Sequence, residues 1–229
     1  MQLKWLGQGG YIFIYNNLKI CIDPYLSNYV QEKEGLERLL PIPISPEDLS
    51  VDMIIFTHNH IDHLDPQTIA FVQKDQVKFV GPDSCKDILI EAGINENAFT
   101  SLNQGNKLKI NDISLKAVYA KHTIDSIGLV LSTKDTIIYL TGDTEYDKKL
   151  LEIKQYNPDI LISCINGKWG NMNIAEAVQL AEKLEVKITI PSHYGMFAEN
   201  TANLDKFREC MKQSDLNYRE LPFNKYVTL

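Results

Sequence analysis

The sequence predicts an α/β fold in which two β-sheets carry helices on their outer sides. Two observations predict it. Short apolar runs bounded by turn residues recur along the chain, and each half is β-rich first and alternates strand with helix afterwards. A chain of 229 residues can bury one sizeable core, so we expect a single domain over residues 1–229.

The first half begins with three short strands. Asn16 and Asn17 separate the second from the third, and paired Asn tolerates the positive φ of a tight hairpin turn. Residues 28–50 are the least regular region, because Pro41, Pro43 and Pro46 exclude a continuous helix or central strand. A loop of this length is usually functional or mobile. The expected strands are Leu3–Leu6, Tyr11–Tyr15 and Leu18–Ile22.

From Asp52 onwards, apolar strands alternate with helices. Asp65 before Pro66 indicates a helix N-terminus, and Asn173 with Glu176 is typical of a capping box. The expected strands are Met53–Phe56, Val77–Val80, Lys107–Ile110, Ile113–Tyr119, Ile127–Ser132, Thr136–Leu140, Ile160–Cys164 and Val186–Ile190. The expected helices run from Asp65-Pro66 through Gln73, from Asp83 or Ser84 to Gly93, over Tyr146–Tyr156, from Asn173 through Leu184, and over Leu204–Lys212.

Composition excludes several classes of partner. The net charge of -7 and the lack of a Lys/Arg run argue against a nucleic-acid binder. No stretch reaches the roughly 20 apolar residues of a membrane-spanning helix. The N-terminus lacks the apolar segment of a signal peptide, and the four cysteines form no C-x-x-C pair. We therefore expect a cytoplasmic protein that acts on a small molecule, with homo-oligomerisation left open.

The most informative segment is Thr57-His58-Asn59-His60-Ile61-Asp62-His63. It places three imidazoles and a carboxylate directly after a buried strand, whose rigid end can present them to one point. Imidazole nitrogen and carboxylate oxygen suit Zn²⁺, Mn²⁺ or Fe. A His-rich surface loop is the plain alternative.

The remaining histidines argue against that alternative. The chain has only five, and His122 and His193 also lie just beyond predicted strands. Asp143 follows the predicted strand Thr136–Leu140 in the same way. Each residue alone is better explained as structural, but their joint placement favours a metal site.

The motif His-x-His-x-Asp-His at residues 58–63, followed along the chain by His122, Asp143 and His193, resembles the pattern of the metallo-β-lactamase superfamily. The likeness runs from Trp5-Leu6-Gly7 and Ile22-Asp23-Pro24 to Pro191-Ser192-His193-Tyr194-Gly195, and so covers most of the chain. It implies a four-layer αββα sandwich. The Trp5 motif, Pro46-Glu47-Asp48-Leu49 and Ser192-His193-Tyr194-Gly195-Met196-Phe197 resemble the branch that contains L-ascorbate 6-phosphate lactonase.

The resemblance implies one or two divalent ions, Zn or Mn with Fe as a third choice. It assigns His58, His60 and His122 to one metal, and Asp62, His63 and His193 to the second, with Asp143 bridging. Two such ions make hydroxide available and polarise the scissile bond. Asp62 is the catalytic candidate, because it can orient the water or return its proton. Asp23 is a candidate to hold the imidazoles, although an Asp-Pro turn explains it equally well.

Substrate contacts are harder to predict. The segment from Asn166 to Asn171 follows a predicted strand, so Asn166 and Lys168 are candidates, and Lys168 or Lys121 could meet a phosphate. Solvated lysines are commoner. Tyr194, beside His193, could bind an oxyanion or merely pack. Gly9-Gly10 indicates a turn, not a nucleotide-binding loop.

The favoured function is a metal-dependent hydrolase using a metal-activated hydroxide. The best single guess at its reaction is a lactonase acting on a phosphorylated sugar-acid lactone such as L-ascorbate 6-phosphate. The alternative is a phosphodiesterase acting on a small phosphodiester or a lipid headgroup. β-Lactam degradation and a non-catalytic metal-binding role are weaker, since no signal peptide is expected and no ligand is missing.

Overall fold

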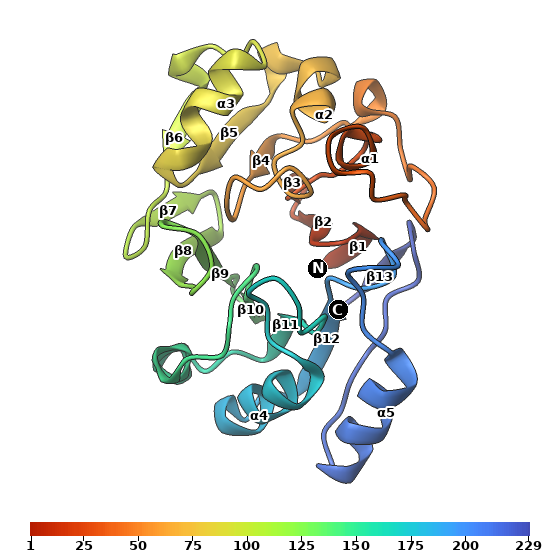
Figure 1. The fold of residues 1–229 in the computed structure, drawn as a ribbon. Helices are drawn as coiled ribbons and strands as arrows, with labels where there is room; N and C mark the ends of the chain where they lie inside the picture. The colour runs from red at the N-terminus through yellow and green to blue at the C-terminus, as the bar shows by residue number, and fades with distance from the viewer. The chain divides into compact units, whose positions relative to one another are not determined.

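Two mixed β-sheets, one in each of two units, form the framework of the protein (Figure 1). The computed structural model describes residues 1–229. The first unit comprises residues 1–101, 195–199 and 221–229, and the second comprises residues 102–194 and 200–220. The α/β class with two sheets, predicted from the alternation of strands and helices, is confirmed.

The sheet of the first unit has seven strands. The first three form an antiparallel meander, and Asn16 and Asn17 have φ angles of 47° and 66°, as the tight turn between two of them requires. The strands from β3 to β6 are parallel, so their carboxyl ends lie at one edge. In spatial order the strands are β13 (Tyr226–Thr228), β1 (Gln2–Gly7), β2 (Gly10–Tyr15), β3 (Leu18–Ile22), β4 (Met53–Ile55), β5 (Lys78–Gly81) and β6 (Phe99–Ser101).

Helices α2 (Pro66–Phe71) and α3 (Lys86–Glu91) lie together on one side of β4 and β5 (Figure 1). Asp65 caps α2, as predicted, by accepting a hydrogen bond from the amide of Gln67. Ile69 and Leu89 belong to the same buried cluster as Ile54 and Phe79 of the sheet, so the helices and strands share one core. Short 3₁₀ turns lie at Pro46–Asp48, Lys74–Gln76, Asp83–Cys85 and Glu96–Ala98.

The sheet of the second unit has six strands. Strands β10, β11 and β12 are parallel neighbours, and β7 to β10 pair antiparallel. Strand β8 therefore runs in the same direction as β10, and four strands end at the same edge. In spatial order the strands are β12 (Ile188–Ser192), β11 (Ile160–Cys164), β10 (Ile137–Leu140), β9 (Ile127–Ser132), β8 (Ile113–Tyr119) and β7 (Lys107–Ile110).

Helix α4 (Ile174–Leu184) begins with the predicted capping box. Asn173 accepts from the amide of Glu176, whose side chain accepts from the amide of Asn173. Leu180 and Leu184 belong to the same buried cluster as Tyr139 and Leu161, which joins α4 to β10 and β11. The second unit also contains the 3₁₀ helix η5 (Lys148–Tyr156) and helix α5 (Leu204–Gln213).

Several elements differ from the sequence prediction. Helix α1 (Tyr29–Glu34) lies in the region expected to be irregular, and β6 and β13 are edge strands that the sequence pattern did not show. Val30 is the only buried residue of α1, so the segment has no helical periodicity. Strand β12 begins at Ile188 rather than Val186, because its register is set by pairing with β11.

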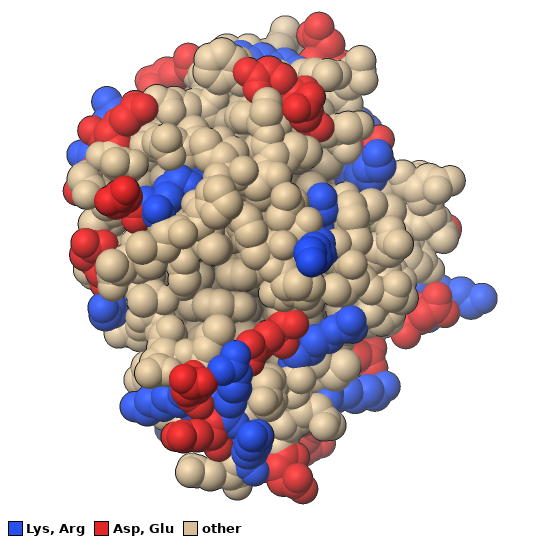
Figure 2. All heavy atoms as spheres, turned by 90° about the vertical axis from the view of Figure 1, so that its right-hand side faces the viewer, with Lys and Arg blue, Asp and Glu red and all other residues tan.

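The surface mixes both signs of charge. On the face shown in Figure 2, Lys and Arg lie interspersed with Asp and Glu. None of the helices combines the length and apolar character that crossing a bilayer requires.

Candidate metal centre

The first group of candidate ligands lies in the loop after β4. His58 and His63 are fully buried, and their ring centroids are 4.2 Å apart. His58 Nε2 lies 3.1 Å from His60 Nδ1, and the amides of His63 and Leu64 both donate to the carbonyl of His60, which closes the loop into a tight turn. The first unit thus brings together the three imidazoles that the motif predicted.

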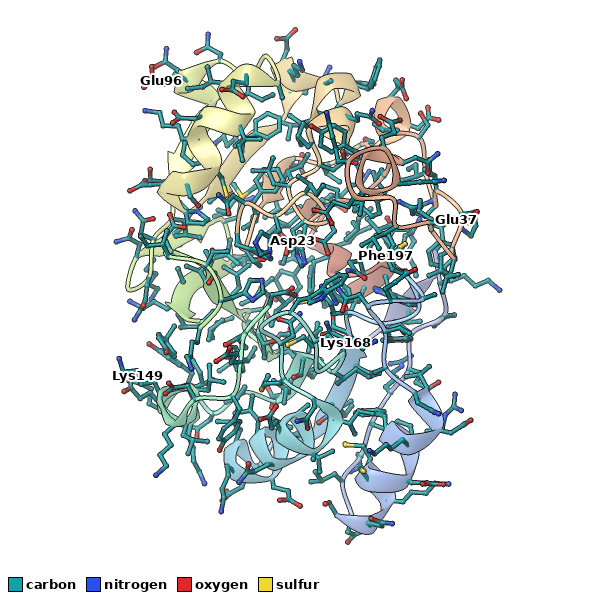
Figure 3. The ribbon with its side chains drawn as sticks, viewed as in Figure 1. Asp23, Glu37, Glu96, Lys149, Lys168 and Phe197 are labelled. Atoms are coloured by element: carbon teal, nitrogen blue, oxygen red, sulfur yellow. The ribbon has the colours of Figure 1, made fainter.

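Asp23 fixes two of these imidazoles. It follows β3, the parallel neighbour of β4, so the carboxyl ends of the two strands place it beside Thr57. Its carboxylate accepts from the Thr57 amide at 2.8 Å, from the Thr57 hydroxyl at 2.6 Å and from His63 Nδ1 at 2.8 Å. Asp23 lies in the interior of the first unit, whereas Glu37 and Glu96 lie at its periphery (Figure 3).

These contacts determine which ring nitrogens carry the protons. The Thr57 hydroxyl donates its one hydrogen to Asp23, so at 3.0 Å it can only accept from His58 Nδ1–H. His63 Nδ1 likewise donates to the Asp23 carboxylate. In the neutral form of both rings, Nε2 is therefore the unprotonated nitrogen, and a neutral imidazole binds a metal ion through that nitrogen. The proposed supporting role of Asp23 matches this geometry, and its φ of 45° shows that it also makes the turn.

Asp62 lies beside His63, with 3.7 Å between Asp62 Oδ2 and His63 Nε2. Its side chain keeps 18% of its surface exposed, more than that of His63, which has 1%. Gln8 Nε2 donates to the same Oδ2 at 2.7 Å. Asp62 thus lies beside a candidate ligand and is partly exposed to solvent.

The Gly9-Gly10 turn has a role that the sequence did not show. A Cβ atom on Gly9 would lie 2.7 Å from His63 Cε1 and 3.0 Å from Nδ1. Only glycine therefore allows the backbone after β1 to lie against the His63 ring. A glycine pair next to a Trp-Leu-Gly strand was the one available sequence signal, and it could not specify which side chain packed there.

The second group of candidate ligands lies at the carboxyl edge of the second sheet. His122 follows β8, Asp143 follows β10, and His193 comes directly after Ser192, the last residue of β12. His193 Nε2 lies 3.0 Å and His122 Nε2 lies 3.8 Å from Asp143 Oδ2. The second unit thus brings its three predicted ligands together, with Asp143 between the two imidazoles.

The loop after β11 forms hydrogen bonds to two of these candidate ligands. The carbonyl of Gly170 accepts from His122 Nδ1–H at 3.0 Å, so in the neutral ring Nε2 is the nitrogen without a proton, and it lies 3.8 Å from Asp143 Oδ2. Asn171 Nδ2 donates to Asp143 Oδ2 at 2.8 Å. A Cβ atom on Gly170 would lie 2.9 Å from His122 Nδ1, so glycine is required here as it is at Gly9.

Substituting Gly170 by Ala is expected to weaken metal binding at His122 about 10-fold or more, because the new methyl displaces the ring from its supporting carbonyl. Gly105→Ala is a matched control. Gly105 has φ of 91° against 84° for Gly170, but nothing lies within 4 Å of its Cβ position. Both variants should lose about 1–2 kcal/mol of stability through backbone strain. Chelator competition should show reduced metal affinity for Gly170→Ala alone, and equal affinities would contradict the packing argument.

The donor atoms of both groups fit a divalent cation. They are imidazole nitrogens and carboxylate oxygens, the borderline set that Zn²⁺, Mn²⁺ and Fe share. In the first group, His63 donates its Nδ1–H to Asp23, and its Nε2 faces Asp62. In the second group, His122 donates its Nδ1–H to the Gly170 carbonyl, and its Nε2 faces Asp143. A neutral imidazole in a fixed tautomer is what metal ligation requires, so the residues fit the implied metal.

The candidate substrate contacts lie in varied environments. Asn166 is buried, and its Nδ2 donates to Asn200 Oδ1 at 2.6 Å. Lys168 is exposed in the loop after β11 (Figure 3). Burial, followed by the charge of Glu220, raises the pKa of Tyr194, so its hydroxyl stays protonated. Lys121 Nζ forms an ion pair with Glu145 at 2.6 Å, so Glu145 already neutralises the positive charge that was a candidate to bind a phosphate.

Comparison with known proteins shows the family to which the chain belongs. The profile of the beta-lactamase superfamily domain matches residues 19–194, more than half of the chain. A UPF0173 metal-dependent hydrolase of Archaeoglobus fulgidus is 25% identical over 95% of this chain and 93% of its own length.

Two solved structures share the fold across the whole chain. Igni18, a metallo hydrolase from Ignicoccus hospitalis, superposes with a TM-score of 0.79 at 20% identity, over 100% of this chain and 97% of its own. An isothiocyanate hydrolase from Delia radicum gut bacteria gives 0.83 at 19% identity, over 100% and 99%. The chain therefore has the metallo-β-lactamase fold and belongs to the metallo-β-lactamase superfamily of metal-dependent hydrolases.

Proposed function

We propose that this protein is a hydrolase whose two ligand groups together bind one or two divalent ions. One ion would be held by His58, His60 and His122, the other by Asp62, His63 and His193, and Asp143 would bridge them. The observation that carries the proposal is the fixed tautomer of three buried or nearly buried imidazoles, His58, His63 and His122. Superfamily membership supports joining the two groups in one centre.

Bound divalent ions lower the pKa of water and polarise the oxygen of a scissile carbonyl or phosphoryl group. The protein's own contribution is to position groups around that chemistry. Asp62 is partly exposed and accepts a hydrogen bond from Gln8. We assign it the role of orienting the attacking water and returning its proton to the leaving group. Asp23 and the Gly170 carbonyl hold the imidazoles in their metal-binding tautomer.

The substrate class that we favour is a lactone, and specifically the lactone of a phosphorylated sugar acid such as L-ascorbate 6-phosphate. The support is the likeness of the Trp5-Leu6-Gly7 and Ser192–Phe197 motifs to that branch of the superfamily. Lys168 is an exposed cation in the loop that supports His122 and Asp143, and we assign it to the phosphate of the substrate. Beside it, Trp169 exposes 59% of its surface and offers an apolar face to a sugar ring.

Phosphodiester hydrolysis is the second candidate, because the same ligand set suits phosphoryl transfer. The named structural neighbour adds isothiocyanates as a third substrate type to test. A pH-stat screen of lactones and phosphorylated lactones, run beside bis-p-nitrophenyl phosphate and an isothiocyanate, separates these candidates. Turnover of a lactone supports the proposal, and turnover of only the phosphodiester or the isothiocyanate would replace it.

Removal of the metal is expected to abolish turnover. Dialysis against a strong chelator should remove activity, because the ligand groups alone supply no nucleophile or electrophile of comparable strength. Addition of Zn²⁺ or Mn²⁺ should restore it, and the ion that restores the highest rate identifies the preferred metal. Full activity in protein shown by elemental analysis to be metal-free would refute the proposal.

A further inference from the structure

Each acidic ligand of the proposed centre is held by the amide of a buried side chain. In the first unit, Gln8 Nε2 donates to Asp62 Oδ2 at 2.7 Å. In the second unit, Asn171 Nδ2 donates to Asp143 Oδ2 at 2.8 Å. The amide nitrogen must face the carboxylate in both cases, because a carboxylate offers only acceptors.

Gln8 is fixed in place before it reaches Asp62. Its side chain is fully buried, and its backbone carbonyl accepts from Trp5 Nε1 at 3.1 Å. Its φ of 47° lies in the left-handed region, which costs backbone energy for a residue with a Cβ atom. The Trp5-Leu6-Gly7-Gln8 turn therefore presents one amide toward Asp62.

The side chain of Asn171 is also buried, and its amide donates to Asp143. Its side chain is 8% exposed, and its buried Oδ1 accepts no hydrogen bond from the protein. A buried amide that leaves one polar atom unsatisfied is a poor choice for stability alone. The contact that it does make, to Asp143, accounts for its presence.

We propose that Gln8 and Asn171 are positioning residues for the metal centre, which fix the rotation of the Asp62 and Asp143 carboxylates. The inference rests on the proposed function in that it takes both carboxylates as metal ligands. Both donors are neutral, so they orient an anion without cancelling the charge that attracts a cation. Lysine or arginine at either position would form an ion pair in competition with the metal.

The chemistry predicts a specific phenotype. Asn171→Leu and Gln8→Met replace the amide with an apolar side chain of similar size and so remove the donor, which lets each carboxylate rotate away from the metal. Loss of such a supporting hydrogen bond typically costs 10- to 100-fold in metal affinity. The visible spectrum of the Co²⁺-loaded protein should also change in each variant, because the geometry at Asp62 or Asp143 changes.

The experiment measures Zn²⁺ affinity by chelator competition, the Co²⁺ spectrum, and thermal stability without metal. Asn203→Ala, which removes the N-cap of α5, and Thr68→Val, which removes a buried donor to Asp65, are the control variants of the second and first unit. They should lower stability without changing metal affinity. If Asn171→Leu or Gln8→Met does not fold, Asn171→Ala and Gln8→Ala are measured in the same way.

A 10- to 100-fold loss of affinity with an altered Co²⁺ spectrum, beyond that of the controls, supports the inference. Unchanged affinity and spectrum in variants that are merely less stable would overturn it. Metal binding by the wild-type protein distinguishes failure of the positioning role from failure of the proposed function. If wild type binds no metal, the proposed centre fails; if wild type binds metal as the variants do, only the positioning role fails.

Discussion

Substituting Asp62 by Asn is expected to lower turnover about 10²- to 10⁴-fold, the usual contribution of a general acid or base. The replacement keeps the shape of the side chain, and its amide oxygen can still accept from Gln8. It removes the charge that orients water and the site that receives a proton. Steady-state kinetics on the substrate identified by the screen would measure kcat, and elemental analysis would confirm that metal is retained.

Asp52→Asn is the control for this prediction. Asp52 also lies in the first unit. Its exposed carboxylate accepts a hydrogen bond from the backbone amide of Lys19 and contacts none of the candidate ligands. Its turnover should equal that of the wild type. Metal-loaded Asp62→Asn with unchanged kcat would show that Asp62 takes no part in proton transfer.

Substituting Asp23 by Ala is expected to affect stability and metal binding together. Three buried donors, the Thr57 amide, the Thr57 hydroxyl and His63 Nδ1–H, lose their acceptor. Each unsatisfied donor costs about 1–3 kcal/mol, so the free energy of unfolding should fall by about 3 kcal/mol or more. Because His63 and His58 lose their fixed tautomers, metal affinity should fall about 10- to 100-fold as well.

Asp65→Ala distinguishes these two effects. Asp65 is also fully buried and accepts from the Gln67 amide and the Thr68 hydroxyl, but it caps α2 and supports no imidazole. It should lower stability in urea denaturation and leave the metal affinity unchanged. If Asp23→Ala bound metal as tightly as wild type, Asp23 would be only a turn residue.

The sequence predicted the candidate ligands because each one follows a strand. Strands β4, β8, β10 and β12 end just before His58, His122, Asp143 and His193, so parallel geometry within each sheet brings the ligands of that unit to one edge. Apolar runs of four or more residues are the strongest local signal in the sequence. The elements that carry these ligands were therefore also the ones that could be predicted.

The supporting contacts could not be predicted in the same way. Gln8 contacts Asp62 across 54 positions of the sequence, and Gly170 contacts His122 across 48. No local pattern encodes such a partner, since glycine and amides are equally typical of turns. Strand β13 was missed for a related reason, because its three residues pair with β1 from the opposite end of the chain.

We propose that imidazoles and carboxylates from both units bind the same metal centre. A crystal structure of the Zn²⁺- or Mn²⁺-loaded protein, with anomalous maps at the metal edge, tests it most directly. We expect a Zn²⁺ ion about 2.0–2.1 Å from His58 Nε2 and equally close to His122 Nε2. Metal bound by the residues of one unit only, or at a place away from these histidines, would contradict the claim.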